Sequence, residues 1–302
     1  MWLINRMGMH GLIYDKNMIS FFTEPFGYEF FRLGVVAAVL AGGLCGLVGV
    51  YVVLRHMSYI GHGLSHAIFG GAVVSYLLKL NFYVGAGLWG FLAALIINQT
   101  ARKKKIGADA AIGIVTTASF ALGVALISRG KSFSRDFEAA LFGNILGVAL
   151  PDVAILVIVS ILIALLIFFF YKSLLFSTFD PEVAPAFGIK THLVDMLFSL
   201  ILAATIIASM KILGVTLIAA SLVIPPTIAR LLTDSFRKMI LLSTLVGAFC
   251  GFFGMLLSWY LDASSGATIV LFAAALFLGT LFYQLITQRK NLSNRLIDTD
   301  IA

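Results

Sequence analysis

Two histidines one helical turn apart are the residues of this sequence best suited to chemistry. His62 and His66 lie in an apolar segment, residues 57–78, that contains no Asp, Glu, Lys or Arg. An α-helix rises about 1.5 Å per residue, which predicts two imidazoles on one face, about 6 Å apart along the axis. One soft cation can touch both rings, so the spacing predicts a metal site. The alternative is two buried histidines that hydrogen-bond to the backbone or to hydroxyl groups such as those of Ser58 and Ser65.

The composition places this helix in a membrane. The 302 residues are 61% hydrophobic and only 12% charged, whereas a soluble domain carries about a quarter charged residues. The net charge of +7 does not indicate nucleic-acid binding, because its clearest run, residues 102–105, directly follows an apolar segment as a cytoplasmic anchor does. Cys45 and Cys250 lie in apolar stretches without metal-type spacing and are interpreted as packing residues. The fold class is therefore all-α, a polytopic transmembrane helical bundle in the lipid bilayer.

Nine segments are long and apolar enough to cross a bilayer, and with soft boundaries we expect about eight to nine spans. They are residues 33–54, 57–78, 84–101, 110–128, 153–171, 193–209, 214–232, 240–261 and 267–286. Lys and Arg residues on alternate connections predict an outside N-terminus and an inside C-terminus. Residues 1–30 are expected to form an N-terminal interfacial segment, 31–290 a single transmembrane domain, and 291–302 a cytoplasmic tail.

Glycine and proline mark helix contacts and breaks. The patterns Gly42-x-x-x-Gly46 and Gly247-x-x-x-Gly251 predict helices that approach each other closely. The pair Pro225-Pro226 removes two amide donors inside residues 214–232 and predicts a kink or break in that helix. The kink either borders a transport pathway or is purely structural.

The predicted cytoplasmic connection 172–192 has the signals of a short helix near residues 180–188. Asp180 can cap it, Pro181 suits its first turn, Glu182 favours its N-terminus, and Gly188 can end it in a left-handed conformation. Such a helix between two spans forms a knob, a surface protrusion to which an ATPase subunit can bind. The alternative is an ordinary capped loop helix. Asp195, soon after this loop, is interpreted as a helix-start residue rather than a metal ligand.

Two enzyme classes do not fit. A zinc hydrolase motif H-E-x-x-H needs Glu after the first histidine, and Gly63 follows His62. A phosphate-binding loop ending at residues 130–132 (Gly-Lys-Ser) needs glycine at position 125, which is Ala125. The chain is therefore predicted not to be an enzyme.

Several motifs in order along the chain, covering about residues 33–286, resemble the membrane permeases of zinc, manganese and iron ABC importers. They are residues 53–58 (Val-Leu-Arg-His-Met-Ser), 61–67 (Gly-His-Gly-Leu-Ser-His-Ala), 111–114 (Ala-Ile-Gly-Ile), 141–146 (Leu-Phe-Gly-Asn-Ile-Leu), 179–182 (Phe-Asp-Pro-Glu) with 188–189 (Gly-Ile), and 214–217 (Gly-Val-Thr-Leu) with 223–225 (Val-Ile-Pro).

The resemblance implies a cobalamin-importer-like type II permease that acts as a homodimer in a bacterial or archaeal cytoplasmic membrane. It also implies a separate cytoplasmic ABC ATPase, an external metal-binding protein, and a transported divalent metal (Zn²⁺, Mn²⁺ or Fe²⁺) with no permanently bound cofactor. The family usually has an acid where His62 stands. Two neutral imidazoles hold a hard ion such as manganese less well than a carboxylate does, which shifts the expectation toward zinc or iron, with zinc preferred. The competing function is a secondary metal-ion transporter driven by an ion gradient.

Overall fold

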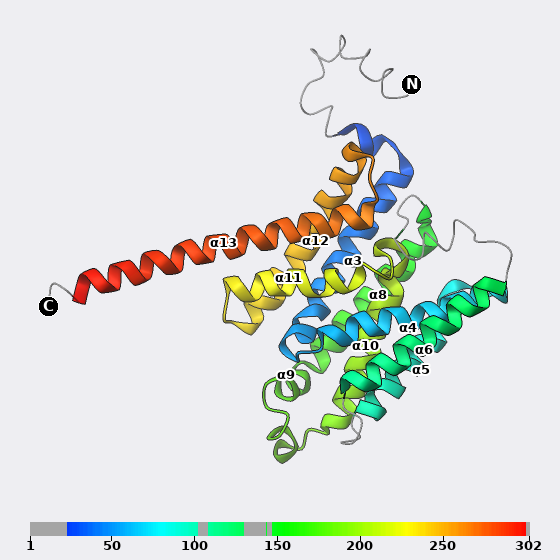
Figure 1. Cartoon of the computed structure of the whole chain (residues 1–302), viewed down its shortest axis with the longest axis horizontal. Helices are drawn as coiled ribbons and strands as arrows, with labels where there is room; N and C mark the ends of the chain where they lie inside the picture. The colour runs from blue at the N-terminus through cyan, green and yellow to red at the C-terminus, as the bar shows by residue number, and fades with distance from the viewer. Residues whose placement is uncertain (1–22, 102–107, 130–142, 144–146, 300–302) are drawn as a thin grey trace, which may run out of the picture.

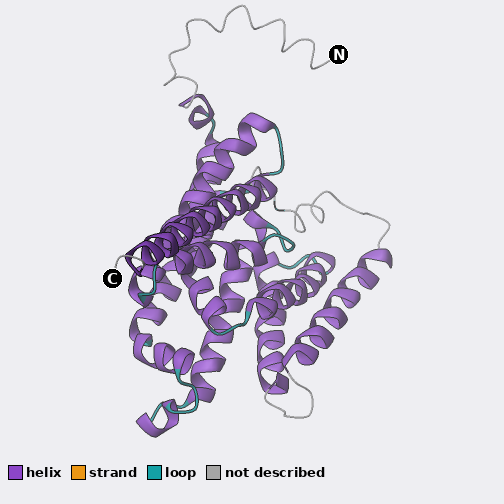
Figure 2. Cartoon of the chain, turned by 60° about the vertical axis from the view of Figure 1, so that its left-hand side comes forward, coloured by secondary structure: helices purple, strands orange, loops and turns teal. Residues whose placement is uncertain are grey.

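The computed structural model describes residues 23–101, 108–129, 143 and 147–299, and every regular element in this part of the chain is helical (Figures 1 and 2). Most of the expected interfacial segment, the basic run 102–105 and most of the motif at 141–146 lie outside the described residues.

Each of the nine predicted segments forms one long helix. These helices are α3 (Glu29–Leu54), α4 (Ser58–Leu77), α5 (Phe82–Ala101), α6 (Ala108–Arg129), α8 (Leu150–Phe169), α10 (Thr191–Leu213), α11 (Ile218–Leu232), α12 (Phe236–Leu261) and α13 (Ser265–Thr299). Three shorter elements accompany them: the 3-10 turns η2 (Glu24–Gly27) and η4 (Ala184–Phe187), and helix α9 (Tyr171–Phe179). The all-α polytopic bundle predicted from the sequence is confirmed.

Six of the long helices are long and apolar enough to cross a membrane by themselves: α3, α5, α8, α10, α12 and α13. The apolar parts of α6 and α11 are shorter. Helix α4 has 20 residues and no charged side chain, but its glycines, serines and two histidines make it less apolar. More than half of its residues are buried in the bundle, and a helix covered by protein tolerates polar residues that lipid does not.

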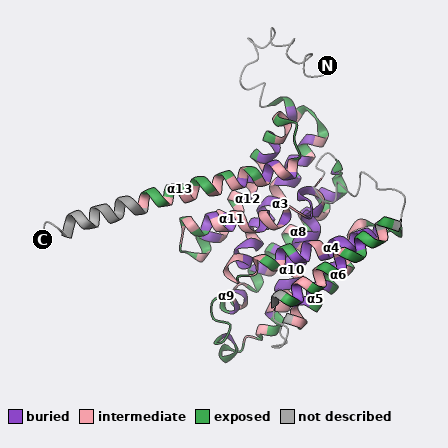
Figure 3. Cartoon of the chain, viewed as in Figure 1, coloured by how far each residue is buried: buried purple, intermediate pink, exposed green. Residues whose placement is uncertain are grey.

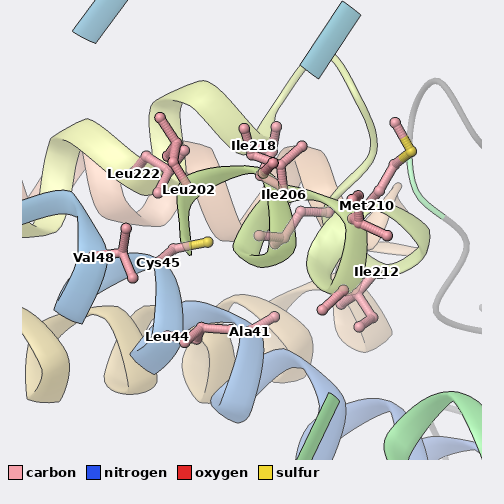
Figure 4. Packing of buried hydrophobic residues seen from close by; sticks show 14 of the residues in the cluster. Ala41, Leu44, Cys45, Val48, Leu202, Ile206, Met210, Ile212, Ile218 and Leu222 are labelled. Carbon is pink, nitrogen blue, oxygen red and sulfur yellow. The ribbon is translucent and has the colours of Figure 1, made fainter. Parts of the chain in front are cut away.

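Helices α3 and α10 form the centre of the bundle. In their most apolar windows 72% and 67% of residues are buried, against 11% in α13. Figure 3 shows the same contrast, with α13 projecting from the bundle. Small and branched side chains of α3, α10 and α11 interlock in the core, as Figure 4 shows for Cys45, Ile206 and Leu222. Cys45 and Cys250 are both buried free thiols, in agreement with their predicted packing role.

The glycine patterns place α3 directly against α12. A Cβ added to Gly42 would lie 2.9 Å from the carbonyl carbon of Gly247 and nearer still to its oxygen. One turn along, the Ser243 hydroxyl donates a 2.6 Å hydrogen bond to the backbone carbonyl of Gly46. Two helices can approach this closely only where side chains are absent. The two glycine patterns therefore pack on each other as antiparallel partners, which confirms the predicted close approach.

Candidate metal site and coupling region

Helix α4 brings His62 and His66 together on one face. Their ring centroids lie 4.7 Å apart, with the rings at 74° to each other. The His66 ring also meets the Phe120 ring of α6 edge to face, with 5.3 Å between centroids. In the single chain His62 is exposed and His66 is half-buried. The pair thus lies where α4 meets α6, with one imidazole open to the surroundings of the chain.

The alternative bonding partners do not engage these rings. The Ser65 hydroxyl donates to the backbone carbonyl of His62 at 2.8 Å, not to its imidazole. Among the residues that the structure describes, no hydrogen bond or ion pair reaches either ring. The ring nitrogens are therefore available to a ligand from outside the described chain.

A single copy of the described chain offers this pair and no larger metal-binding group. Across residues 23–101, 108–129, 143 and 147–299, no cluster of three or more His, Cys, Asp or Glu side chains is close enough to hold an ion. The buried hydroxyl oxygen of Thr116 on α6 lies beside Gly63, next to the pair, and has no hydrogen-bond partner among the described residues. Two imidazoles without a carboxylate form an incomplete coordination shell, which suits brief binding better than storage.

The segment from Asp180 to Gly188 lies at the opposite end of the molecule from η2 (Figure 1). The short helix starts later than the sequence predicts: Asp180 ends α9, residues 181–183 form turns, and only residues 184–187 form a single 3-10 turn. Gly188 ends it with φ of +77°, the left-handed conformation predicted for this glycine. Pro181 and Glu182 are exposed, and so is the ring of Phe187 at 68%. The segment is a surface knob with apolar and acidic side chains side by side.

Pro225 and Pro226 are buried inside α11, which continues through both without interruption. Pro226 offers no N–H to the Leu222 carbonyl, and α3 places Gly49 directly against that oxygen and the Pro226 ring. The Leu222 side chain in turn lies 3.4 Å from a Cβ built on Gly61, the residue before His62. Pro226 therefore packs against α3, and Leu222, one turn earlier in α11, packs against both α3 and the start of α4.

The structure also shows a polar contact that sequence reasoning missed. The sequence places Arg55 in the motif at residues 53–58 and Asp195 at a helix start, and does not pair them. In the structure the Arg55 guanidinium donates to the Asp195 carboxylate at 3.0 Å. A second ion pair at the other end of α10 joins Lys211 to Asp152 at 2.7 Å. A buried charge usually has a partner. The apolar residues around Arg55 in the sequence could therefore have indicated that this arginine forms an ion pair.

Comparison with known proteins agrees with this fold. Residues 27–284 match the model of the ABC 3 transport family. The chain is 35% identical over 268 residues to the manganese transport system membrane protein MntC of Halalkalibacterium halodurans, covering 89% of this chain and 92% of that protein. It is 32% identical over 277 residues to a membrane protein of Haemophilus influenzae assigned by name to iron transport, covering 90% and 98%.

Solved structures are similar as well. The structure of PsaBC from Streptococcus pneumoniae in complex with a Fab superposes with a TM-score of 0.79 at 36% identity, covering 87% of this chain and 95% of that one. An inward-facing metal-chelate type ABC transporter shares the fold alone, with a TM-score of 0.66 at 17% identity and coverage of 83% and 85%.

The chain belongs to the ABC 3 transport family. It is a multi-pass membrane permease subunit of an ABC importer and is not itself an ATPase. Membership decides against the alternative of a secondary transporter driven by an ion gradient.

Proposed function

We propose that this chain imports a divalent transition metal as one half of a permease homodimer. Two cytoplasmic ATPases would drive the dimer, and an external metal-binding protein would deliver the ion. The names of the relatives support a metal cargo, since they specify manganese or iron transport. The match over residues 27–284 supports an importer in which this chain forms the membrane pathway and a separate subunit hydrolyses ATP.

In this proposal His62 and His66 hold the metal briefly during its passage. The observation that carries it is the pair of adjacent imidazoles, 4.7 Å apart and without bonding partners among the described residues. The exposed His62 leaves room for a ligand from water or from the second permease copy to complete the shell. A binding step with two protein ligands stays weak enough to release the ion.

The names of the relatives and the chemistry of the histidine pair point to different metals. The relatives are named for manganese and iron, whereas two imidazoles favour zinc over manganese. We propose that His62, where the family resemblance implies an acid, moves the preference of this permease from manganese toward zinc. Purified importer in proteoliposomes, offered Zn²⁺, Mn²⁺ and Fe²⁺ in competition and read by elemental analysis, tests this. Preferential uptake of manganese would refute the zinc preference and leave the metal site itself standing.

The histidine pair is tested by the double variant His62→Ala/His66→Ala. We expect loss of metal uptake while assembly with the ATPase is retained. His192→Ala is the matched control, because this exposed histidine lies outside the pair, and we expect it to transport normally. Unchanged uptake by the double variant would remove the site assignment. Uptake should require ATP and persist in the presence of ionophores.

The segment from Asp180 to Gly188 is the proposed contact with the ATPase. ATP-driven closure of the ATPases would push on this knob and reorient the helices around the metal. Its exposed Val183 and Phe187 support the proposal, since apolar side chains beside acidic ones are typical of a surface that a partner covers. Changing Glu182 or Gly188 should uncouple ATP hydrolysis from transport, and normal coupling in both variants would refute the contact. Pro225 and Pro226 of α11 would border the moving region.

A further inference from the structure

Arg55 holds three elements, α3, α9 and α10, together at the end of the bundle that carries the 180–188 segment. Its side chain is only 7% exposed, although no arginine is easily buried without partners. The Nε atom donates to the Thr178 hydroxyl of α9 at 3.0 Å, and Nη1 donates to the Asp195 carboxylate of α10 at 3.0 Å. The guanidinium also lies over the Phe198 ring, 4.8 Å from its centroid. A planar, forked donor can bridge two helices in this way and a lysine cannot.

The position of Arg55 in the chain links the proposed ATPase contact to the proposed metal helix. Thr178 lies two residues before Asp180, where the knob begins. On the other side, Arg55 caps α3 only three residues before α4 begins at Ser58. The intervening turn is tight, because the Met57 amide donates back to the Val52 carbonyl at 2.8 Å. A displacement of α9 therefore reaches α4 through few intervening bonds.

The same network extends to a further helix, α5, and lines a pocket that opens to the surface. The Ser199 hydroxyl donates to the backbone carbonyl of Asp195, and the Asn98 amide of α5 donates to Ser199 at 3.1 Å. A cavity of about 340 Å³ lies among these side chains. Within the described residues, the buried Nη2 of Arg55 and Oδ1 of Asn98 lack hydrogen-bond partners. These two atoms can form new hydrogen bonds, and the adjacent pocket leaves room for the side chains to move. The network can therefore rearrange without displacing close-packed core side chains.

We propose that Arg55 is a positioning residue that transmits movement of the 180–188 segment to α4 and its histidine pair. The inference rests on the proposed coupling role of that segment. It requires both arms of the guanidinium, one on α9 and one on α10. Loss of either arm would let the ATPase move α9 without moving α4.

The test measures metal moved per ATP hydrolysed by the permease assembled with its ATPase in proteoliposomes, with Zn²⁺ and Mn²⁺ as probes. Arg55→Met should lower this ratio by about tenfold or more, since it removes two charge-assisted hydrogen bonds. Thr178→Val keeps the shape of the side chain without the acceptor, and should lower the ratio too. Thr178→Ser restores the acceptor and should restore coupling, which shows that the hydroxyl and not the methyl group of Thr178 is required.

Lys211→Met supplies the matched control. It breaks the ion pair of α10 with Asp152, at the end of that helix away from the knob. We expect it to lower thermal stability and to keep the ratio of metal to ATP near that of the unaltered permease. If Lys211→Met uncouples as strongly as Arg55→Met, or if Arg55→Met and Thr178→Val stay fully coupled, the inference is overturned.

The outcomes also separate this inference from the proposed function. If Arg55→Met stays coupled while the Glu182 and Gly188 variants are uncoupled, only the transmission role of Arg55 is refuted. Normal coupling in the Glu182 and Gly188 variants would instead refute the ATPase contact. Normal uptake in the double histidine variant would refute the metal site and leave the Arg55 measurement valid.

Discussion

Replacing Gly42 by alanine should move helix α3 away from helix α12. The new Cβ would lie 2.9 Å from the carbonyl carbon of Gly247, and nearer still to its oxygen. A Cβ atom essentially never lies within 3.0 Å of a heavy atom from another part of the fold. Both colliding groups belong to helix backbones, so neither can rotate away. The only relief is a shift of α3 away from α12.

The cost follows from the size of that shift. A gap of about 0.5–1 Å forfeits roughly a quarter to a half of the attraction between facing atoms. The Ser243 hydrogen bond to the Gly46 carbonyl lies one turn along the same seam and would lengthen with it. Overpacking of this kind costs about 1–3 kcal/mol. We expect Gly42→Ala to lower the free energy of unfolding by that amount.

The neighbouring glycine is a matched control for this experiment. A Cβ on Gly43 would meet its nearest neighbour, the Cβ of Ala248, at an ordinary 3.7 Å. Since alanine is the better helix former by up to about 1 kcal/mol, Gly43→Ala should be neutral or slightly stabilising. Thermal unfolding of both purified variants in the same detergent measures the difference. Equal midpoints for Gly42→Ala and Gly43→Ala would refute the close-approach argument.

Three further changes are expected to act on stability, each read as an unfolding midpoint in detergent. Lys211→Met should lower the free energy of unfolding by about 2 kcal/mol, because it leaves the buried Asp152 carboxylate without its cation. The cost is smaller than for a fully buried ion pair because the lysine side chain is partly exposed to solvent. An unshifted midpoint would contradict this. Ser243→Ala should cost about 0.5–1.5 kcal/mol through the lost buried hydrogen bond. His56→Gly should gain up to about 1 kcal/mol, since His56 has φ of +55° and glycine adopts this conformation without strain; destabilisation would show that its side chain matters more than its backbone.

The helices themselves were predictable because the signals are local. Long apolar runs gave nine segments, and nine helices occupy them, since an apolar run of this length can satisfy its backbone in lipid only as a helix. The boundaries were less predictable. Helix α11 begins at Ile218 rather than at residue 214, because Gly214 ends α10 with φ of +79°. Similarly, α13 continues to Thr299, well past the apolar run that ends near residue 286.

The candidate site was predictable to a similar depth. Helical periodicity alone places His62 and His66 on one face, and the structure has them there with rings in contact distance. Periodicity does not show which helix faces the pair. The contact of His66 with Phe120, and the separation of the pair from any third metal-binding side chain in the described chain, depend on the packing of α6 against α4.

The sequence by itself determined the membrane class of this protein, the position of its long helices and the pairing of its histidines, because each depends on residues within a few turns of one another. Only the tertiary structure decided what the buried charges do. Arg55 pairs with Asp195 across 140 positions, and Lys211 with Asp152 across 59. The free energy of a buried charge depends on which helices surround it, and no local pattern along the chain records that arrangement.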